Sequence, residues 1–423
     1  MKPTIGIEVH CELKTNSKAF SQSKNTYGEI PNTMINVLDL GYPGTLPVLN
    51  KKIIDLGIKA AIVLNCDITR TIYFDRKNYF YPDNPKNYQV TQNSTPIGRN
   101  GYVLIEYDGI KKKIEIEEIH IEEDTCKSIH ESNHTLLDFN RAGIPLVEIV
   151  TKPVISNEKE AVLYLEALRE MFLYAGISDV KIEEGSMRCD LNISLSNTEK
   201  LGTKVEVKNI GSISNVADSV LYEIKRQEKL LNEGIVLKEE TRRWDDKTSS
   251  TILMRVKETG NDYRYFPEPD IPKVIIDDQW INNIKKEIPM LPNELKEKYK
   301  NLGINEITIK TLIQNRELSL FLNQLIDKNI NAVVCANILT GDILSYLNKK
   351  YITLKDTKIT EKNIIDLVNK LDSNEISSKI SKDILNELLI NGGNVDDIIS
   401  LKGLKQISNI DEIREIIKNI INN

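Results

Sequence analysis

The sequence predicts an α+β protein in two parts. An N-terminal domain built on an antiparallel sheet (residues 1–292) is followed by an all-helical domain (residues 293–423). Short segments that alternate between polar and apolar residues fill the first part, which also holds nearly all the histidines and aromatic clusters. The second part is rich in Lys, Asn, Ile and Leu and has helical periodicity. Between them, a segment with three prolines (residues 263–272) ends regular structure.

Four segments of the first part have the two-residue period of a strand with one buried face. They are residues 4–13, 113–124, 187–194 and 204–208. Their polar faces comprise Glu8, His10 and Glu12; Glu118, His120 and Glu122; Arg188, Asp190 and Asn192; and Lys204, Glu206 and Lys208. A change of phase after Ile116 predicts a β-bulge in the second segment.

Helical periodicity predicts three helices that cover the sheet. They are residues 51–64, 158–175 and 215–231. The middle one has the clearest ends, with Ser156 or Asn157 as cap and Gly176 as stop. In the second part, residues 304–330 and 360–389 repeat the pattern, and two glycines follow the latter.

The composition is that of a globular protein with 40% hydrophobic and 28% charged residues, and 423 residues suggest two or three domains. A net charge of −6 argues against binding nucleic acid by bulk positive charge, although a local basic face remains compatible with it. No apolar run reaches the roughly 18 residues of a membrane helix, and the N-terminus lacks a signal-peptide pattern. Five scattered cysteines form neither a disulfide framework nor a zinc motif. We therefore expect a reduced, cytoplasmic protein that does not enter membranes.

The polar faces of the strands admit two interpretations. The simpler one is a sheet with helices on one side and water on the other. Two observations argue against it. In each of two strands a histidine lies between two carboxylates on the polar face. Like charges on neighbouring strands also repel one another unless a cation compensates them. Carboxylates with an imidazole suit Mg²⁺ or Mn²⁺ more than zinc, and the interspersed Lys and Arg suit a polyphosphate. We favour a metal–nucleotide site, which must be built from the sheet because the sequence has no Walker A loop, Rossmann fingerprint or kinase glycine loop.

Six long motifs resemble the B subunits of the aspartyl/glutamyl-tRNA(Asn/Gln) amidotransferases and occur in the order of that family. They are IGIEVHCEL (5–13), FDRKNYFYPD (74–83), HIEED (120–124), DFNRAG (138–143), EEGSMRCD (183–190) and DYRYFPEPD (262–270). The later GLKQIS (403–408) is also similar to the family, so the resemblance covers essentially the whole chain.

This resemblance implies a glutamine-synthetase-like cradle in the first domain and a tRNA-dependent ligase reaction of protein biosynthesis. ATP phosphorylates the side-chain carboxylate of Glu or Asp on a misacylated tRNA, and ammonia then displaces phosphate to give the amide. The family also implies a heterotrimer with two partners: an amidase (glutaminase) that releases ammonia from glutamine, and a small third protein that binds around the amidase. Mg²⁺ and ATP are the expected cofactors.

The strand chemistry and the resemblance together define the candidate residues. The expected metal ligands are Glu8, His10, Glu122 and Glu123, with Asp190 and Glu206 as catalytic ligands of a second ion or of bound water. The expected phosphate-binding residues are Lys77, Arg188, Lys204 and Lys208. Two interpretations stay open for Tyr79, Phe80 and Tyr81: a packed turn, or a platform for adenine or the terminal tRNA base.

The chain departs from the family in two places. Many relatives carry a four-cysteine zinc knuckle near the N-terminus, whereas the equivalent positions here are Ser21, Ser23, Asn36 and Asp39. No zinc is expected there, because these residues lack thiolate ligands. We also expect the small C-terminal tail bundle of the family to be absent, so that this chain either holds the tRNA more weakly or holds it by other surfaces.

Two further functions compete with this interpretation. A free-standing Mg²⁺-dependent ligase for a small carboxylate would leave the helical domain without a use. A non-catalytic RNA-binding scaffold would not need the acidic face. The sequence leaves open whether Glu-tRNA(Gln), Asp-tRNA(Asn) or both are substrates.

Overall fold

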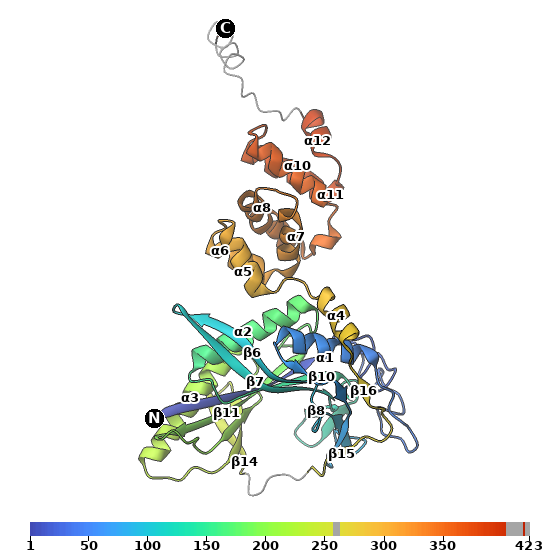
Figure 1. The fold of residues 1–423 in the computed structure, drawn as a ribbon, viewed down its shortest axis with the longest axis vertical. Coiled ribbons are helices and arrows are strands. Elements are labelled where there is room, and N and C mark those ends of the chain that lie inside the picture. The colour runs from blue at the N-terminus through green and yellow to red at the C-terminus, as the bar shows by residue number, and fades with distance from the viewer. Residues whose placement is uncertain (257–262, 403–417, 419–423) are drawn as a thin grey trace. The chain divides into compact units, whose positions relative to one another are not determined.

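The computed structural model describes residues 1–256, 263–402 and 418. Its internal contacts divide the chain into two compact units, Met1–Pro289 and Met290–Asn423 (Figure 1). Residue 262 of the DYRYFPEPD motif and the whole 403–408 motif lie outside the described residues.

The first unit is built on a nine-stranded sheet with the order β14-β13-β12-β11-β1-β10-β7-β6-β2. Its strands are β1 (Lys2–Glu12), β2 (Asp67–Ile68), β6 (Gly98–Tyr107), β7 (Ile110–Glu123), β10 (Pro145–Thr151), β11 (Met187–Ser196), β12 (Val205–Lys208), β13 (Glu240–Asp245) and β14 (Ser250–Val256). Only β12 and β13 pair in parallel; the other neighbours are antiparallel. A mostly antiparallel sheet followed by helices confirms the predicted fold class.

Strand β1 shows how the sequence separates the two faces of the sheet. Ile5, Ile7 and Val9 are fully buried, as the alternation predicts, while their polar neighbours emerge on the opposite face. In β7 the pairing with β10 skips one residue, since Val150 lies opposite Glu118 but Thr151 lies opposite Ile116. This is the β-bulge predicted from the change of phase after Ile116.

Three helices lie against the sheet: α1 (Lys51–Val63), α2 (Glu158–Ala175) and α3 (Ile213–Asn232). Helix α1 contacts β6 and β7, α2 contacts β6, and α3 contacts β11 (Figure 1). Helix α2 has the predicted ends: the Asn157 side chain accepts the Glu160 N–H at 2.9 Å, and Gly176 is left-handed. Helix α3 begins two residues earlier than predicted, because Ser212 caps it.

Short strands form three smaller sheets. They are β4 (Asp75–Asn78) with β5 (Tyr88–Thr91) and β15 (Phe266–Pro267); β3 (Thr71–Ile72) with β16 (Val274–Ile275); and β8 (Lys127–His130) with β9 (Thr135–Asp138). In the first, Arg76 donates two hydrogen bonds to the buried Glu268 carboxylate at 2.6 and 2.9 Å. This bidentate pair ties the proline-rich segment, which contains β15, to β4, and β4 also carries Lys77.

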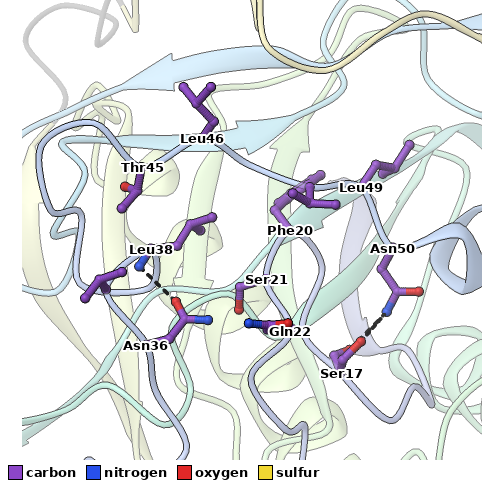
Figure 2. Close-up of a pocket in the computed structure, with 12 residues that line it drawn as sticks. Ser17, Phe20, Ser21, Gln22, Asn36, Leu38, Thr45, Leu46, Leu49 and Asn50 are labelled. Carbon is purple, nitrogen blue, oxygen red and sulfur yellow. Dashed lines mark hydrogen bonds between the residues drawn. The ribbon is translucent and has the colours of Figure 1, made fainter.

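The chain between β1 and α1 has no regular strand or helix. It encloses a pocket of about 530 Å³, lined by apolar side chains such as Phe20, Leu38 and Leu46 and by an equal number of polar ones (Figure 2). Asn50 ends this irregular segment, because its side chain accepts the Lys52 N–H at 2.9 Å and caps α1.

Helix α4 (Asp278–Glu287) closes the first unit and packs on α1. The second unit contains α5 (Pro292–Asn301), α6 (Glu306–Gln314), α7 (Arg316–Ile326), α8 (Ala332–Ile338), the π-helix η1 (Leu339–Ile343), α9 (Leu344–Lys350), the 3₁₀-helix η2 (Leu354–Asp356), α10 (Glu361–Asp372), α11 (Ser378–Asn391) and α12 (Val395–Lys402). The first helical segment predicted in this part contains α6 and α7; the second contains α10 and most of α11, which ends two residues later than predicted. Within the described ranges, no helix combines the length and apolar character needed to span a bilayer.

Candidate metal and phosphate site

Four central strands each contribute one residue to a row across the polar face of the sheet. His10 on β1 lies opposite Arg188 on one side and opposite Glu148 on the other. Glu148 in turn lies opposite His120. Directly opposed residues in antiparallel strands have Cβ atoms about 4.5–5.5 Å apart, so the register alone brings these side chains together.

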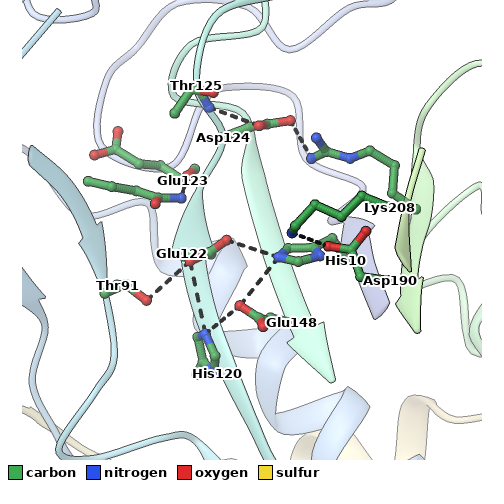
Figure 3. Close-up of polar contacts among 12 residues, drawn as sticks. His10, Thr91, His120, Glu122, Glu123, Asp124, Thr125, Glu148, Asp190 and Lys208 are labelled. Carbon is green, nitrogen blue, oxygen red and sulfur yellow. Dashed lines mark hydrogen bonds and ion pairs between the residues drawn. The ribbon is translucent and has the colours of Figure 1, made fainter. Parts of the chain in front are cut away.

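The carboxylates of Glu148 and Glu122 lie between the two imidazoles (Figure 3). Nε2 of His10 is 3.3 Å from Glu148 and 3.6 Å from Glu122, and Nε2 of His120 is 2.9 Å from Glu148 and 3.9 Å from Glu122. Ligand-type atoms of His10, Glu122 and Glu148 all lie within 4.8 Å of one another. Thr91 donates a hydrogen bond to Glu122 at 3.3 Å and helps to orient it.

The protonation of this first cluster follows from its charges. Burial alone would lower the pKa of His10, but attraction to Glu148 and Glu122 outweighs it and raises the pKa to about 9. The pKa of His120 is raised for the same reason. Burial acts in the opposite direction on Glu148, yet the two histidines hold its pKa well below the usual range. Glu148 is therefore ionised, as a metal ligand must be, whereas His10 is protonated near neutral pH and would have to release its proton to bind a metal ion.

A second cluster lies nearby on β1, β11 and β12. Carboxylate oxygens of Glu8, Asp190 and Glu206 lie within 4.8 Å of one another. Lys208 is 2.6 Å from Asp190 and 3.1 Å from Glu206, and Asn192 donates to Glu8 at 2.7 Å. Burial and the charge of Glu148 raise the pKa of Glu8, so this cluster is short of positive charge even with Lys208 present.

Both clusters contribute to the lining of one cavity of about 610 Å³. The volume falls in the range of ligand sites for molecules of nucleotide size. The lining includes His10, Glu122 and Asp190, together with the cationic side chains Lys77 and Arg188. Cations and metal-type ligands thus face the same space.

Three of the four predicted phosphate-binding residues meet in this cavity: Lys77, Arg188 and Lys208. Arg188 donates to the buried Asp124 carboxylate at 2.6 Å, which fixes the guanidinium. Burial would lower the pKa of Lys77, but Glu122 and its neighbours, Tyr265 and Glu148 among them, together outweigh burial and raise the pKa, so the ammonium stays charged. The fourth, Lys204, is exposed and lies outside the cavity lining, because it precedes β12.

The structure does not bring Glu123 to the other predicted ligands. Glu123 follows Glu122 directly in β7, and adjacent residues of a strand point to opposite faces. Its carboxylate accepts hydrogen bonds from Lys86 and from the Val90 N–H, the latter at 2.9 Å. Glu123 therefore forms a buried ion pair away from the cluster of His10, Glu122 and Glu148.

Sequence reasoning missed Glu148 as a ligand and did not include His120 in the site. Strand β10 (PLVEIVT) is apolar except for its glutamate and terminal threonine, so its sequence lacks the alternation that predicts a strand with a polar face. The signal was nevertheless present, because a lone acid in an apolar strand is costly unless it is paired. His120 shares a face with Glu122, as predicted, and pairs with Glu148.

Tyr79 has a different environment from Phe80 and Tyr81, the next two residues of the FDRKNYFYPD motif. Tyr79 lines the cavity and packs edge-on against Tyr263, with ring centroids 6.3 Å apart. Phe80 and Tyr81 are 73% and 60% exposed, so they do not form a packed turn. Tyr263 also packs against Tyr265 and lies under the Lys77 ammonium. An aromatic cluster thus adjoins the cationic wall of the cavity.

The sequence matches two family models and is similar to known proteins that share one name. Residues 3–282 match the model described as the GatB/GatE catalytic domain, and residues 320–423 match the GatB domain. The chain is 47% identical to a protein of Bacillus cereus (strain B4264) and 46% identical to one of Bacillus mycoides (strain KBAB4). Each match covers the whole chain and 90% of the relative. Both relatives are named as the B subunit of an aspartyl/glutamyl-tRNA(Asn/Gln) amidotransferase.

Proposed function

The chain belongs to the family of B subunits of aspartyl/glutamyl-tRNA(Asn/Gln) amidotransferases, and on this premise we propose that it activates the side-chain carboxylate of a misacylated tRNA. The enzyme is then a ligase of protein biosynthesis that converts Glu-tRNA(Gln) or Asp-tRNA(Asn) to the corresponding amide. One observation carries the proposal: two clusters of metal-type ligands and three cationic side chains contribute to a single cavity.

The reaction has two steps. A carboxylate oxygen attacks the γ-phosphorus of ATP, ADP leaves, and an acyl phosphate forms. Ammonia then attacks the acyl carbon, and the bond from this carbon to the bridging oxygen breaks, so that phosphate leaves with an oxygen that came from the carboxylate. Both reactants of the first step are anions, and the site therefore has to supply positive charge.

The donor sets fit hard divalent cations such as Mg²⁺, since they combine five carboxylates with one imidazole. His10, Glu122 and Glu148 would hold one ion, and Glu8, Asp190 and Glu206 a second. An ion held there would supply positive charge beside the phosphates. His120 is not one of these ligands. Its contact with Glu148 at 2.9 Å orients the carboxylate of a ligand.

The cationic side chains bind and orient the phosphates of ATP. The Arg188 guanidinium is held by Asp124 and presents its remaining donors to the cavity. Lys208 bridges Asp190 and Glu206, so it is positioned between the second acidic cluster and the cavity. Lys77 approaches from β4, on the side of the aromatic cluster.

No cysteine of the described residues is suited as a nucleophile to release ammonia from glutamine. Burial raises the pKa of all five cysteine thiols, for example to about 12 for Cys66 and Cys189 and about 11 for Cys126, so none is a thiolate near neutral pH. The chain also has a Ser-Ser-Lys run at residues 377–379, in which a serine could be considered as a nucleophile. Its first serine, Ser377, instead caps α11, where its hydroxyl accepts the Ile380 N–H at 3.3 Å. Ammonia therefore has to come from an amidase partner.

We expect the purified chain to show no glutaminase activity. With ATP, Mg²⁺ and misacylated tRNA, it should form the amide from free ammonium but not from glutamine. Adding the amidase and the small third protein should restore the use of glutamine. The assay follows amide formation on Glu-tRNA(Gln) and Asp-tRNA(Asn) separately, which also reveals the substrate. Glutamine hydrolysis by the isolated chain would refute this division of labour.

We assign the two units different tasks within a cytoplasmic heterotrimer that also contains the amidase and the small third protein. The first unit performs the phosphoryl and acyl transfers, since the cavity lies entirely within it. The helical unit helps to hold the tRNA.

Ser21, Ser23, Asn36 and Asp39, at which the resemblance implies zinc-binding cysteines in many relatives, form a hydrogen-bonded group here. The Asp39 carboxylate accepts hydrogen bonds from the Ser21 hydroxyl at 2.7 Å, the Ser23 hydroxyl at 2.5 Å and the Asn36 N–H at 3.0 Å. The ammonium of the fully buried Lys18 lies 3.4 Å from the same carboxylate. This network supports a zinc-free role, in which Asp39 connects the segments that a metal would otherwise join.

A further inference from the structure

Helix α9 ends on a residue with an unusual backbone conformation. Tyr351 has φ 55° and ψ 40°, the left-handed region that glycine adopts without strain. The Tyr351 N–H donates to the Asn348 carbonyl at 3.3 Å, and the Ile352 N–H donates to the Leu347 carbonyl at 3.2 Å. This pattern is a Schellman motif, in which glycine is the usual residue at the position of Tyr351.

The tyrosine ring contributes almost no packing that would offset this strain. Tyr351 is 96% exposed, more than any other large apolar or aromatic residue of the described chain. Glycine would end the helix with less strain, so the stability of the fold does not account for the aromatic side chain. A ring held in water is, however, free to stack on a flat partner.

Four lysines accompany Tyr351 in residues 349–358, which we call the lysine loop. They are Lys349, Lys350, Lys355 and Lys358. All four are exposed, and none forms an ion pair with another described residue. Four other lysines of this unit lie within 3.1 Å of an acid: Lys298 with Asp327, Lys370 with Glu375, Lys382 with Asp342 and Lys402 with Glu387. Unpaired lysines such as Lys310 and Lys379 also occur, but singly, on α6 and α11. The lysine loop is thus a local excess of uncompensated positive charge.

The only acid in the lysine loop is already engaged in local structure. Asp356 accepts hydrogen bonds from the N–H and the hydroxyl of Thr353, both at 2.8 Å. The loop therefore has a net charge of +3 within a chain whose net charge is −6. A polyanion that approaches the helical unit is attracted to this loop rather than to the chain as a whole.

Contacts in the middle and at the last residue hold the lysine loop in one conformation. Leu354 is buried, and its N–H donates to the Glu317 carboxylate at 2.9 Å. The Lys358 N–H donates to the Leu389 carbonyl at 3.3 Å. Binding a partner would therefore require little ordering of the backbone.

We propose that the lysine loop binds phosphates of the tRNA substrate while Tyr351 stacks on an unpaired base. This rests on the proposed function, which makes tRNA the substrate. Lysine ammonium groups bind phosphates as point charges, and exposed aromatic rings stack on splayed bases of single-stranded RNA. An acidic protein partner would match the lysines, but RNA accounts for both the charge and the exposed ring.

Tyr351→Gly separates a role in binding from a role in stability. In the assembled enzyme, glycine should leave the thermal midpoint Tm unchanged or raise it, because it relieves the left-handed strain. The same change should weaken tRNA affinity by about tenfold, the loss expected for one stacked base. Tyr351→Phe, which keeps the ring, should bind tRNA as the wild type does. Unchanged tRNA affinity in Tyr351→Gly would refute the stacking contact.

The lysines are tested by the salt dependence of tRNA binding. Each phosphate contact adds roughly 0.7–0.9 to the log–log slope, so Lys349→Ala with Lys350→Ala should lower it by about 1.4–1.8. The matched control, Lys310→Ala with Lys379→Ala, makes the same charge change at exposed lysines elsewhere in the helical unit. It should leave the slope nearly unchanged.

The possible outcomes are distinguishable. An equal loss of slope in both double variants would show that only general charge matters and would overturn the proposal. Unchanged tRNA binding together with failed assembly of the heterotrimer would assign the loop to a protein partner instead. Wild-type enzyme that forms no amide on tRNA would contradict the proposed function itself, whereas active wild type with unaffected variants would contradict only this inference.

Discussion

Glu148→Gln is expected to lower ATP-dependent phosphorylation of the misacylated tRNA by about 100-fold or more in kcat/KM. The substitution keeps the size of the side chain but removes the charge that lies between His10 and His120. A neutral amide is a poor ligand for Mg²⁺, and even partners of metal ligands typically contribute 10–100-fold to metal affinity. Raising the Mg²⁺ concentration should recover part of the activity, since the loss originates in metal binding.

The matched control is Glu117→Gln, which makes the same chemical change at the exposed bulge residue of β7. This variant should retain wild-type kinetics. Circular dichroism and thermal unfolding of both variants would show whether the fold is kept. A folded Glu148→Gln enzyme with full activity would contradict the assignment of the first cluster.

Arg188→Met is the second change with a large expected effect, again about 100-fold in kcat/KM. Arg188 lies beside three acids, and its guanidinium is held by Asp124. Burial and the charge of Asp124 raise the pKa of Glu12 to about 7, and Arg188 opposes this shift. Without Arg188, the cavity loses a phosphate donor and retains uncompensated negative charge, so both ATP binding and the transfer should suffer.

Arg188→Lys should recover only part of this loss, because lysine restores the charge but not the planar fork. Arg99→Met is the control, as Arg99 is half exposed on β6 and lies 3.6 Å from Glu118, away from the cavity lining. Steady-state kinetics with varied ATP would show the effect. Equal kinetics for Arg188→Met and Arg99→Met would exclude Arg188 from phosphate binding.

Local patterns were sufficient to predict much of the fold. The alternation in β1, the bulge in β7 and the capped helix α2 all follow from neighbouring residues, and the structure has them as expected. The order of strands was not predictable in this way. Strand β1 pairs with β10 and β11, which lie more than 130 residues further along the chain. Such pairing depends on long-range contacts that a periodic pattern does not encode.

The site shows the same division between local and long-range information. His10 and Glu122 were predicted from the polar faces of their strands, and the structure brings them within 3.6 Å of each other. The sequence pattern does not predict Glu148 as a ligand, because its strand is otherwise apolar. Only the strand register shows that Glu148 lies between two histidines. Glu123 was selected with Glu122 from an acidic run, although the parity of a strand separates adjacent residues.

The most direct test of the central claim follows an oxygen atom. Glu-tRNA(Gln) or Asp-tRNA(Asn) labelled with ¹⁸O in the side-chain carboxylate is incubated with the assembled enzyme, ATP, Mg²⁺ and ammonium, and the released phosphate is analysed by mass spectrometry. If the chain activates the carboxylate by phosphorylation, one ¹⁸O should appear in the phosphate for each amide formed. Amide formation with unlabelled phosphate would contradict this account.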